Sequence, residues 1–289
     1  MPSFIKQAAE AGFANASSYD LHRPSYPAEA VDKLLGALGL IGANGAKVLD
    51  LAAGTGKFTE LLARRPEAYE ITAVEPHAGM LQELDKKALK GVVTKSGTAT
   101  SIPLEDESVD AIIIAQAFHW FATQETLREL HRVLKPTGVL GLIWNVEDYN
   151  APKSWKPTTL WESKVKNLMW SFDDHNPRFR HEGWKKVFED QVKSSPLTIQ
   201  TVDPLFSLPL GEESVPFERW LSKQGVWDRY NTLSQIAILE GEDRERVKKT
   251  VFDALDGDEV EKNANGDVAI HGSTFLAWTT SIPTDTLGQ

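Results

Sequence analysis

The segment KVLDLAAGTGKFTELLARR, residues 47–65, combines residue types that could hold a small ligand. An apolar run leads to an acid at Asp50, small residues follow through Gly54 and Gly56, and apolar residues then recur at helical spacing. Glycine adopts backbone conformations that other residues avoid and lets a ligand approach the main chain closely. A strand, a glycine turn and a helix in this order predict a nucleotide-type pocket.

The glycine spacing argues against two phosphate-bearing ligands. A dinucleotide site needs G-x-G-x-x-G, but Thr59 occupies the third glycine position counted from Gly54, and Lys57 occupies it counted from Ala52. A triphosphate loop needs G-x-x-x-x-G-K-[ST], and Leu51 stands at its first glycine position. The turn therefore admits a ligand without the residues that phosphates need.

Two acids near this turn are candidate ligand contacts. Glu75 ends the second predicted strand, nineteen residues after Gly56, where a carboxylate can accept hydrogen bonds from both hydroxyls of a ribose. Alone it is equally consistent with a solvated acid at a strand end, but next to a glycine turn it favours the ribose contact. Asp50 either meets an amino group of the ligand through water or binds the N–H groups of the turn.

Short apolar runs alternate with helical patterns from residue 46 to residue 145, which predicts a mostly parallel sheet with helices on both faces. Two later strands extend the same sheet, so we expect an α/β fold with seven strands. The predicted strands are 47–52, 70–74, 92–95, 111–117, 139–144, 201–210 and 267–282, and the predicted helices include 56–65, 80–89, 123–134, 215–225 and 243–255. The expected parts are an N-terminal arm (1–45), a cofactor-binding core (46–149), a cap (150–200) and a C-terminal part completing the sheet (201–289).

The composition limits the classes of partner. The chain of 289 residues has a formal charge of −10, which disfavours non-specific binding to nucleic acid or to an anionic membrane. It contains no cysteine, and its seven histidines show no metal-ligand spacing, so we expect no metal site. No apolar run has the length of a membrane span, and the N-terminus has no signal-peptide pattern, which together predict a cytoplasmic protein.

The segment 151–193 differs from the rest of this acidic chain. It carries nine Lys and Arg against six acids, and it holds four of the nine tryptophans. Its basic residues, Arg178 among them, could position an acidic substrate between apolar walls. The segment could equally be a solvated helical cap whose tryptophans pack against the sheet, and we expect both descriptions to hold in part.

Four segments in this order, VLDLAAGTGKFT, AVEPHAGML, SGTATSIPLEDESVDAI and LKPTGVLGLIW, resemble the class I S-adenosylmethionine-dependent methyltransferases. YDLHRPSYP and AQAFHWF are similar to the small-molecule branch that includes trans-aconitate methyltransferase. The resemblance covers residues 19–144 and implies a Rossmann-like, doubly wound sheet with S-adenosylmethionine as cofactor. Two positions depart from the pattern, because Ala52 stands where many members have glycine and Thr98 where many have aspartate.

The resemblance also implies a role for each matching residue at the cofactor. The turn would line the methionine and ribose portions, Glu75 would hold the ribose, and Met80 would border the adenine unless it is plain helix core. The N-terminal arm would fold over the cofactor, or would pack there only for stability. The implied cofactor-binding residues are Tyr19, Arg23, Asp50, Ala52, Gly54, Gly56, Glu75, Pro76, His77, Met80, Thr98, Ala99 and Gln116.

His119 is the candidate catalytic residue, because it follows the fourth core strand where substrates approach such sheets. It could abstract a proton, orient an acidic substrate, or be structural. Trp120, Trp144 and Arg178 are the candidate substrate residues.

Methyl transfer from a sulfonium is an in-line displacement, and a carboxylate acceptor needs no base whereas a phenol, alcohol or protonated amine does. The family resemblance therefore suggests O-methylation of a small carboxylic acid by a monomer or homodimer. A phenol, thiol or amine acceptor, or a cofactor-binding protein without activity, remains an alternative.

Overall fold

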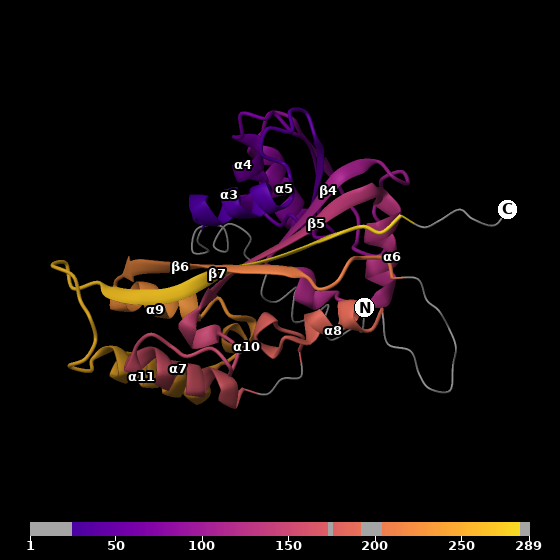
Figure 1. The fold of residues 1–289 in the computed structure, drawn as a ribbon. Coiled ribbons are helices and arrows are strands. Elements are labelled where there is room, and N and C mark those ends of the chain that lie inside the picture. Colours follow the sequence, from indigo (N-terminus) through magenta and orange to yellow (C-terminus); the bar gives the residue numbers. More distant parts are fainter. Residues whose placement is uncertain (1–24, 173–175, 192–203, 284–289) are drawn as a thin grey trace, which may run out of the picture. The chain divides into compact units, whose positions relative to one another are not determined.

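The computed structural model describes residues 25–172, 176–191 and 204–283, and Figure 1 shows the course of the chain. The described residues form two compact units. We call the first the sheet unit, which comprises residues 25–144, 182–191, 204–214 and 275–283. We call the second the helical unit, which comprises residues 145–172, 176–181 and 215–274.

The five core strands pair in parallel, as predicted. In the middle of the sheet Leu49 faces Thr72 on one neighbouring strand and Ile112 on the other. The run AIII, residues 111–114, is fully buried, which suits a strand covered on both faces. The strands are β1 (Lys47–Leu51), β2 (Glu70–Val74), β3 (Val92–Lys95), β4 (Val109–Ala115) and β5 (Leu134–Glu147).

Two later strands, β6 (Gly211–Leu221) and β7 (Val268–Thr280), complete a mixed sheet of seven strands in the order β3-β2-β1-β4-β5-β7-β6. The predicted α/β class and the strand number are confirmed. The long strands β5, β6 and β7 each contribute residues to both units.

The predicted helix over 215–225 is wrong for residues 215–221, which belong to a strand. The predicted strand over 201–210 is wrong for residues 204–210, which form no named strand, and residues 201–203 lie outside the described part of the chain. The strand β6 begins at Gly211, and within it exposed residues alternate with less exposed ones, Val215 being buried and Pro216 exposed. That period of two is the pattern of a strand. Proline has no N–H to give to a ladder, and it is tolerated because β6 lies at the edge of the sheet.

Three helices of the sheet unit lie within three residues of the predicted ranges 56–65, 80–89 and 123–134 at each end. Figure 1 shows α3, α4 and α5 grouped in indigo. Thr123 caps α6 as predicted, because its side chain accepts a hydrogen bond from the N–H of Thr126 at 3.2 Å. The helices are α3 (Ala28–Ala37), α4 (Lys57–Ala63), α5 (Ala78–Lys86), α6 (Gln124–Val133) and α8 (Lys186–Glu189), with the 3-10 turns η1 (Phe118–Trp120) and η4 (Gly183–Lys185).

The helical unit has its own apolar core, to which the predicted cap contributes. Trp161 of that segment is buried there beside Tyr149, Trp227 and Tyr230. Its helices are α7 (Leu160–Ser171), α9 (Lys223–Tyr230), α10 (Ser234–Ala237) and α11 (Gly241–Leu255), with the 3-10 turns η2 (Asp148–Asn150) and η3 (Phe179–His181). In Figure 1 α7 and α11 lie side by side, in line with their contacts. Within the described ranges no helix combines the length and the apolar character that a membrane crossing requires.

A buried carboxylate joins α7 to β7 inside the helical unit. Thr159 caps α7, and Glu162 accepts hydrogen bonds from the Thr159 hydroxyl and from the backbone N–H of His271, both at 2.7 Å. Burial raises the pKa of Glu162, although these two donors oppose the shift. The side chain of Glu162 is fully buried, whereas Thr159 and His271 are partly buried.

We expect Glu162→Ala to lower the free energy of unfolding by about 1–3 kcal/mol, because it leaves the partly buried N–H of His271 without its acceptor. The matched control is Glu245→Ala, which removes an exposed carboxylate from α11. Urea unfolding followed by circular dichroism measures both variants. Equal, small effects in the two would show that the Glu162 contacts contribute little to stability.

Candidate functional site

The predicted turn lies at the carboxyl edge of the parallel strands. It follows β1 directly, and its backbone is left-handed at Ala52, Gly54 and Gly56, with φ of 58°, 59° and 86°. A Cβ at position 56 would lie 2.3 Å from Cδ1 of Leu84 and would displace that side chain, so glycine suits this position in space as well as in conformation. Ala52 has a Cβ, so the left-handed conformation is strained at this residue.

Glu75 is linked to this turn by hydrogen bonds. One carboxylate oxygen accepts from the N–H of Gly54 and the other from the N–H of His77, both at 2.9 Å. The side chain is 6% exposed, and burial raises its pKa while the two backbone donors act in the opposite direction. An ionised carboxylate has about four acceptor positions, so positions remain for further donors.

Asp50 is buried beneath the same turn. One of its oxygens accepts from the Thr59 hydroxyl at 2.6 Å, and the other has no hydrogen-bond partner in the described part of the chain. Burial raises the pKa of Asp50 to about 7, and the charge of Glu75 adds to the shift while Thr59 opposes it. Sequence reasoning missed Thr59, although its place in the first turn of a helix after a glycine turn is a signal for such a contact.

The segment after β2 places Met80 against the glycine turn. His77 caps α5, because its Nδ1 accepts from the N–H of Met80 at 3.3 Å. Met80 is 3% exposed, and its sulfur would lie 3.8 Å from a Cβ at position 54. Pro76 is exposed. His77 therefore contacts Glu75 and Met80 lies against the turn, and their contact with the adenine stays a prediction.

Residues after β3 and β4 continue the same edge. Thr98 is exposed and Ala99 buried in a turn closed by Thr98 and Ser101, whose N–H groups each donate to the carbonyl of the other, at 3.2 and 3.1 Å. Gln116 follows β4 with a left-handed φ of 62°, and its N–H donates to the carbonyl of Ile143 at 2.8 Å. Ala52 and Gln116 thus put non-glycine residues in the left-handed region after two adjacent strands, and strained backbone of this kind concentrates at functional sites.

His119 lies in η1 just beyond β4 and contacts aromatic side chains. Its Nδ1 accepts a hydrogen bond from the indole N–H of Trp144 at 3.2 Å, and its ring lies 5.1 Å from that of Trp120. Trp144 is fully buried, and its ring lies 4.8 Å from that of Trp184 and 6.3 Å from that of Phe275. The predicted pair His119 and Trp120 is thus joined by Trp144 from β5.

Trp184 and Phe275 are part of this aromatic cluster and were not predicted. They come from segments far from His119 in the sequence and carry no local signal for such a place. The Nζ of Lys185 lies 5.5 Å from the ring centroid of Trp184 and 5.3 Å from that of Phe275. The same Nζ forms an ion pair with Oε1 of Glu212 at 2.9 Å.

Three predicted site residues are not among those of the sheet unit described above. Tyr19 and Arg23 fall outside the described residues. Arg178 is 8% exposed and belongs to the helical unit. No cluster of three histidine or acidic residues suited to a metal ion occurs in the part of the chain that the structure describes.

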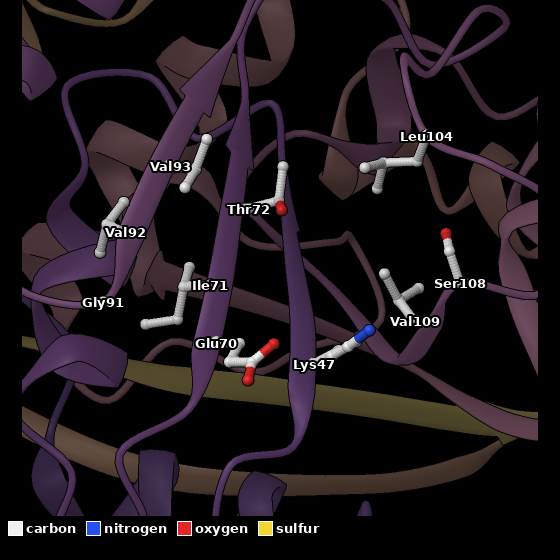
Figure 2. A pocket seen from close by; sticks show the side chains of 10 residues that line it. All are labelled: Lys47, Glu70, Ile71, Thr72, Gly91, Val92, Val93, Leu104, Ser108 and Val109. Carbon is white, nitrogen blue, oxygen red and sulfur yellow. The ribbon is translucent and has the colours of Figure 1, made fainter.

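A cavity of about 590 Å³ lies at the opposite edge of the sheet and is shown in Figure 2. Its lining includes the first residues of four strands, which are Lys47, Glu70, Val92 and Val109. Ligands of open α/β sheets bind outside the carboxyl ends of the strands, so this amino-edge cavity is not the predicted cofactor site.

Ala52→Gly should raise the free energy of unfolding by about 0.5–1 kcal/mol, because relief of the left-handed strain exceeds the entropy that glycine loses on folding. Ala53→Gly is the matched control, since the neighbouring residue has no positive φ and should show the usual loss. Chemical denaturation of both variants makes the comparison. A loss of similar size at the two positions would contradict the strain argument.

Known proteins share both the sequence and the fold of this chain. A family model described as a methyltransferase domain matches residues 49–142. An uncharacterized methyltransferase-like protein of Schizosaccharomyces pombe is 35% identical over 234 residues, which is 81% of each chain. An uncharacterized methyltransferase of Mycobacterium tuberculosis is 47% identical over 131 residues, 45% of this chain and 50% of the relative.

A solved structure, a putative type II methyltransferase from Anaeromyxobacter dehalogenans, matches with a TM-score of 0.56 at 18% identity, covering 91% of this chain and 99% of that one. That likeness shows the fold, and the S. pombe relative shows the family. The chain belongs to the methyltransferase family, and the protein is an S-adenosylmethionine-dependent methyltransferase.

Proposed function

We propose that this enzyme methylates a carboxylate oxygen of a small organic acid. S-adenosylmethionine supplies a methyl group on a sulfonium centre, so the leaving group is already activated. The protein therefore has to hold the acceptor in line and exclude water. The further proposal that the enzyme belongs to a branch similar to trans-aconitate methyltransferase rests on the motifs around Tyr19 and His119.

The residues at the carboxyl edge fit the cofactor. Glu75 would accept hydrogen bonds from the ribose hydroxyls at the acceptor positions that the two backbone donors leave open. Asp50 would face the amino group of the cofactor with its buried second oxygen, which has no hydrogen-bond partner in the described part of the chain. Met80 offers a soft apolar surface for the adenine. The other proposed contacts are Ala52, Gly54, Gly56, Pro76, His77, Thr98, Ala99 and Gln116, with Tyr19 and Arg23 from the arm.

One observation carries the choice of a carboxylate acceptor. In a histidine that acts as a base beside an acid, Nδ1–H donates to a carboxylate that orients the ring. In this protein Nδ1 of His119 instead accepts from the indole of Trp144. The site therefore suits an acceptor that is already ionised at neutral pH, with Trp120 beside it and Arg178 as a proposed substrate residue.

A relative with a named acceptor supports this class. The malonyl-[acyl-carrier protein] O-methyltransferase 1 of Coxiella burnetii is 34% identical over 128 residues, 44% of this chain and 43% of that protein. Its name describes O-methylation of a malonyl group, and a free malonyl end is a carboxylic acid.

A second candidate acceptor comes from another relative. The demethylmenaquinone methyltransferase of Thermotoga maritima is 40% identical over 105 residues, 36% of this chain and 45% of that protein. An aromatic acceptor would suit the ring cluster around His119, and phenols, thiols and amines belong in the same screen.

The test has two stages. Calorimetric titration with S-adenosylmethionine and S-adenosylhomocysteine, with NAD as control, measures cofactor binding. A methyl-transfer screen of carboxylic acids, phenols, thiols, amines and quinones follows. Turnover of a carboxylic acid supports the proposal, and turnover confined to the other classes overturns it.

Glu75→Gln should weaken binding of S-adenosylhomocysteine by about 10-fold or more, because an amide oxygen has fewer acceptor positions than a carboxylate and no charge. The control is Glu70→Gln, an exposed carboxylate at the other end of the same strand. Titration calorimetry on variants with native circular dichroism decides the matter. Unchanged affinity in Glu75→Gln would contradict the ribose assignment.

Asp50→Asn should change how stability depends on pH. The folded-state pKa of about 7 lies above the ordinary value of about 3.9 for a free carboxyl, so this group stabilises the fold fully only below about pH 4. That contribution is lost as the pH rises towards 7. Urea unfolding of the cofactor-free protein from pH 5 to pH 8 should show a smaller loss in Asp50→Asn than in the wild type. Parallel pH profiles would contradict the buried, raised pKa.

A further inference from the structure

The hydrogen bond between Trp144 and His119 determines which imidazole nitrogen carries the proton. The indole Nε1–H is a donor only. Nδ1 of His119, 3.2 Å from it, must therefore present its lone pair. In the neutral ring the proton is then on Nε2, so this second nitrogen of His119 is a hydrogen-bond donor.

The surroundings of Trp144 keep its indole in place. The side chain is fully buried in the sheet unit, and its ring packs at a tilt of 35° against Trp184 and 46° against Phe275. It follows Ile143 on β5, which pairs with Ala115 on β4 just before η1. Because Trp144 contacts Trp184, Phe275 and His119, it cannot turn its N–H away from His119 without repacking the cluster.

We propose that Trp144 is a positioning residue that holds His119 in the Nε2–H tautomer, and that His119 donates a hydrogen bond to an anionic acceptor instead of removing a proton. This inference rests on the proposed function, since it assigns the acceptor's charge state. A carboxylate lone pair forms the new O–CH3 bond while the S–CH3 bond breaks and its electrons stay on sulfur. No proton moves in this step, so no base is required.

The same geometry disfavours acceptors that must lose a proton. A phenol or a protonated amine needs a base at neutral pH. In this tautomer Nε2 already carries its proton, and Nδ1 can take one only if the indole N–H of Trp144 gives up its acceptor. The aromatic side chains that position His119 therefore also favour acceptors that are already ionised when they bind.

The tautomer can be measured without any acceptor. ¹⁵N-histidine NMR of the full chain with S-adenosylhomocysteine, at neutral pH, should show only the Nε2–H tautomer for His119. Trp144→Phe keeps an aromatic ring and removes the N–H, and it should introduce a measurable share of the Nδ1–H tautomer. Trp161→Phe, the same change in the core of the helical unit, should leave the His119 signals unchanged. A wild-type Nδ1–H tautomer, or identical His119 signals in wild type and Trp144→Phe, overturns the proposal.

Kinetics with a carboxylic acid identified in the screen separate donor from base. Glutamine can accept through Oε1 and donate through Nε2 without titrating, so His119→Gln should retain activity within about 10-fold of wild type, and His119→Phe should fall about 10-fold or more below His119→Gln. If His119 is a base, His119→Gln falls as low as His119→Phe, and the proposal is overturned.

A double-mutant cycle tests the role of Trp144. Trp144→Phe should lower kcat/KM in the wild-type background and cost little more in His119→Phe, because no Nδ1 remains to be held. Equal costs in both backgrounds mean a structural role and overturn the positioning assignment. If no carboxylic acid is turned over, the proposed function fails by itself, and the NMR measurement still decides the tautomer.

Discussion

The carboxylate of Glu75 connects the two segments from which the cofactor edge is built. It accepts one hydrogen bond from an N–H of the turn after β1 and another from the N–H of His77, which caps α5, and the side chain is buried. Gly54, which donates the first of these hydrogen bonds, has a left-handed φ of 59°. Removal of water around this carboxylate raises its pKa, and the two backbone donors act against that shift.

Tryptophan has two different uses in this chain. Trp161 fills the core of the helical unit, whereas Trp144 contacts His119 and packs on Trp184 in the sheet unit. The two residues differ in the use of the indole N–H. In Trp144 this group donates to Nδ1 of His119 and so determines which imidazole nitrogen carries the proton, which an apolar ring of the same volume could not do. Bulk and polarity of one side chain thus serve stability and chemistry together.

Most of the parallel sheet could be predicted from the sequence because its signals are local. Apolar runs, a glycine turn and the cap at Thr123 each occupy a few neighbouring residues. The segment 215–225 misled because its charged and aromatic residues also match a helical spacing, and only its edge place in the sheet explains Pro216. The partner of His119 comes from another strand, 25 residues along the chain, so no short pattern could reveal it.

The amino-edge cavity offers a place at which the protein can be labelled. Val93 lines it and is 58% exposed, and the chain contains no cysteine. A cysteine introduced at this position would be a unique thiol in the chain, accessible to a spectroscopic label on the strand next to β2. Because the label would lie at the edge opposite to Glu75, it could report motions of the cofactor edge without occupying it.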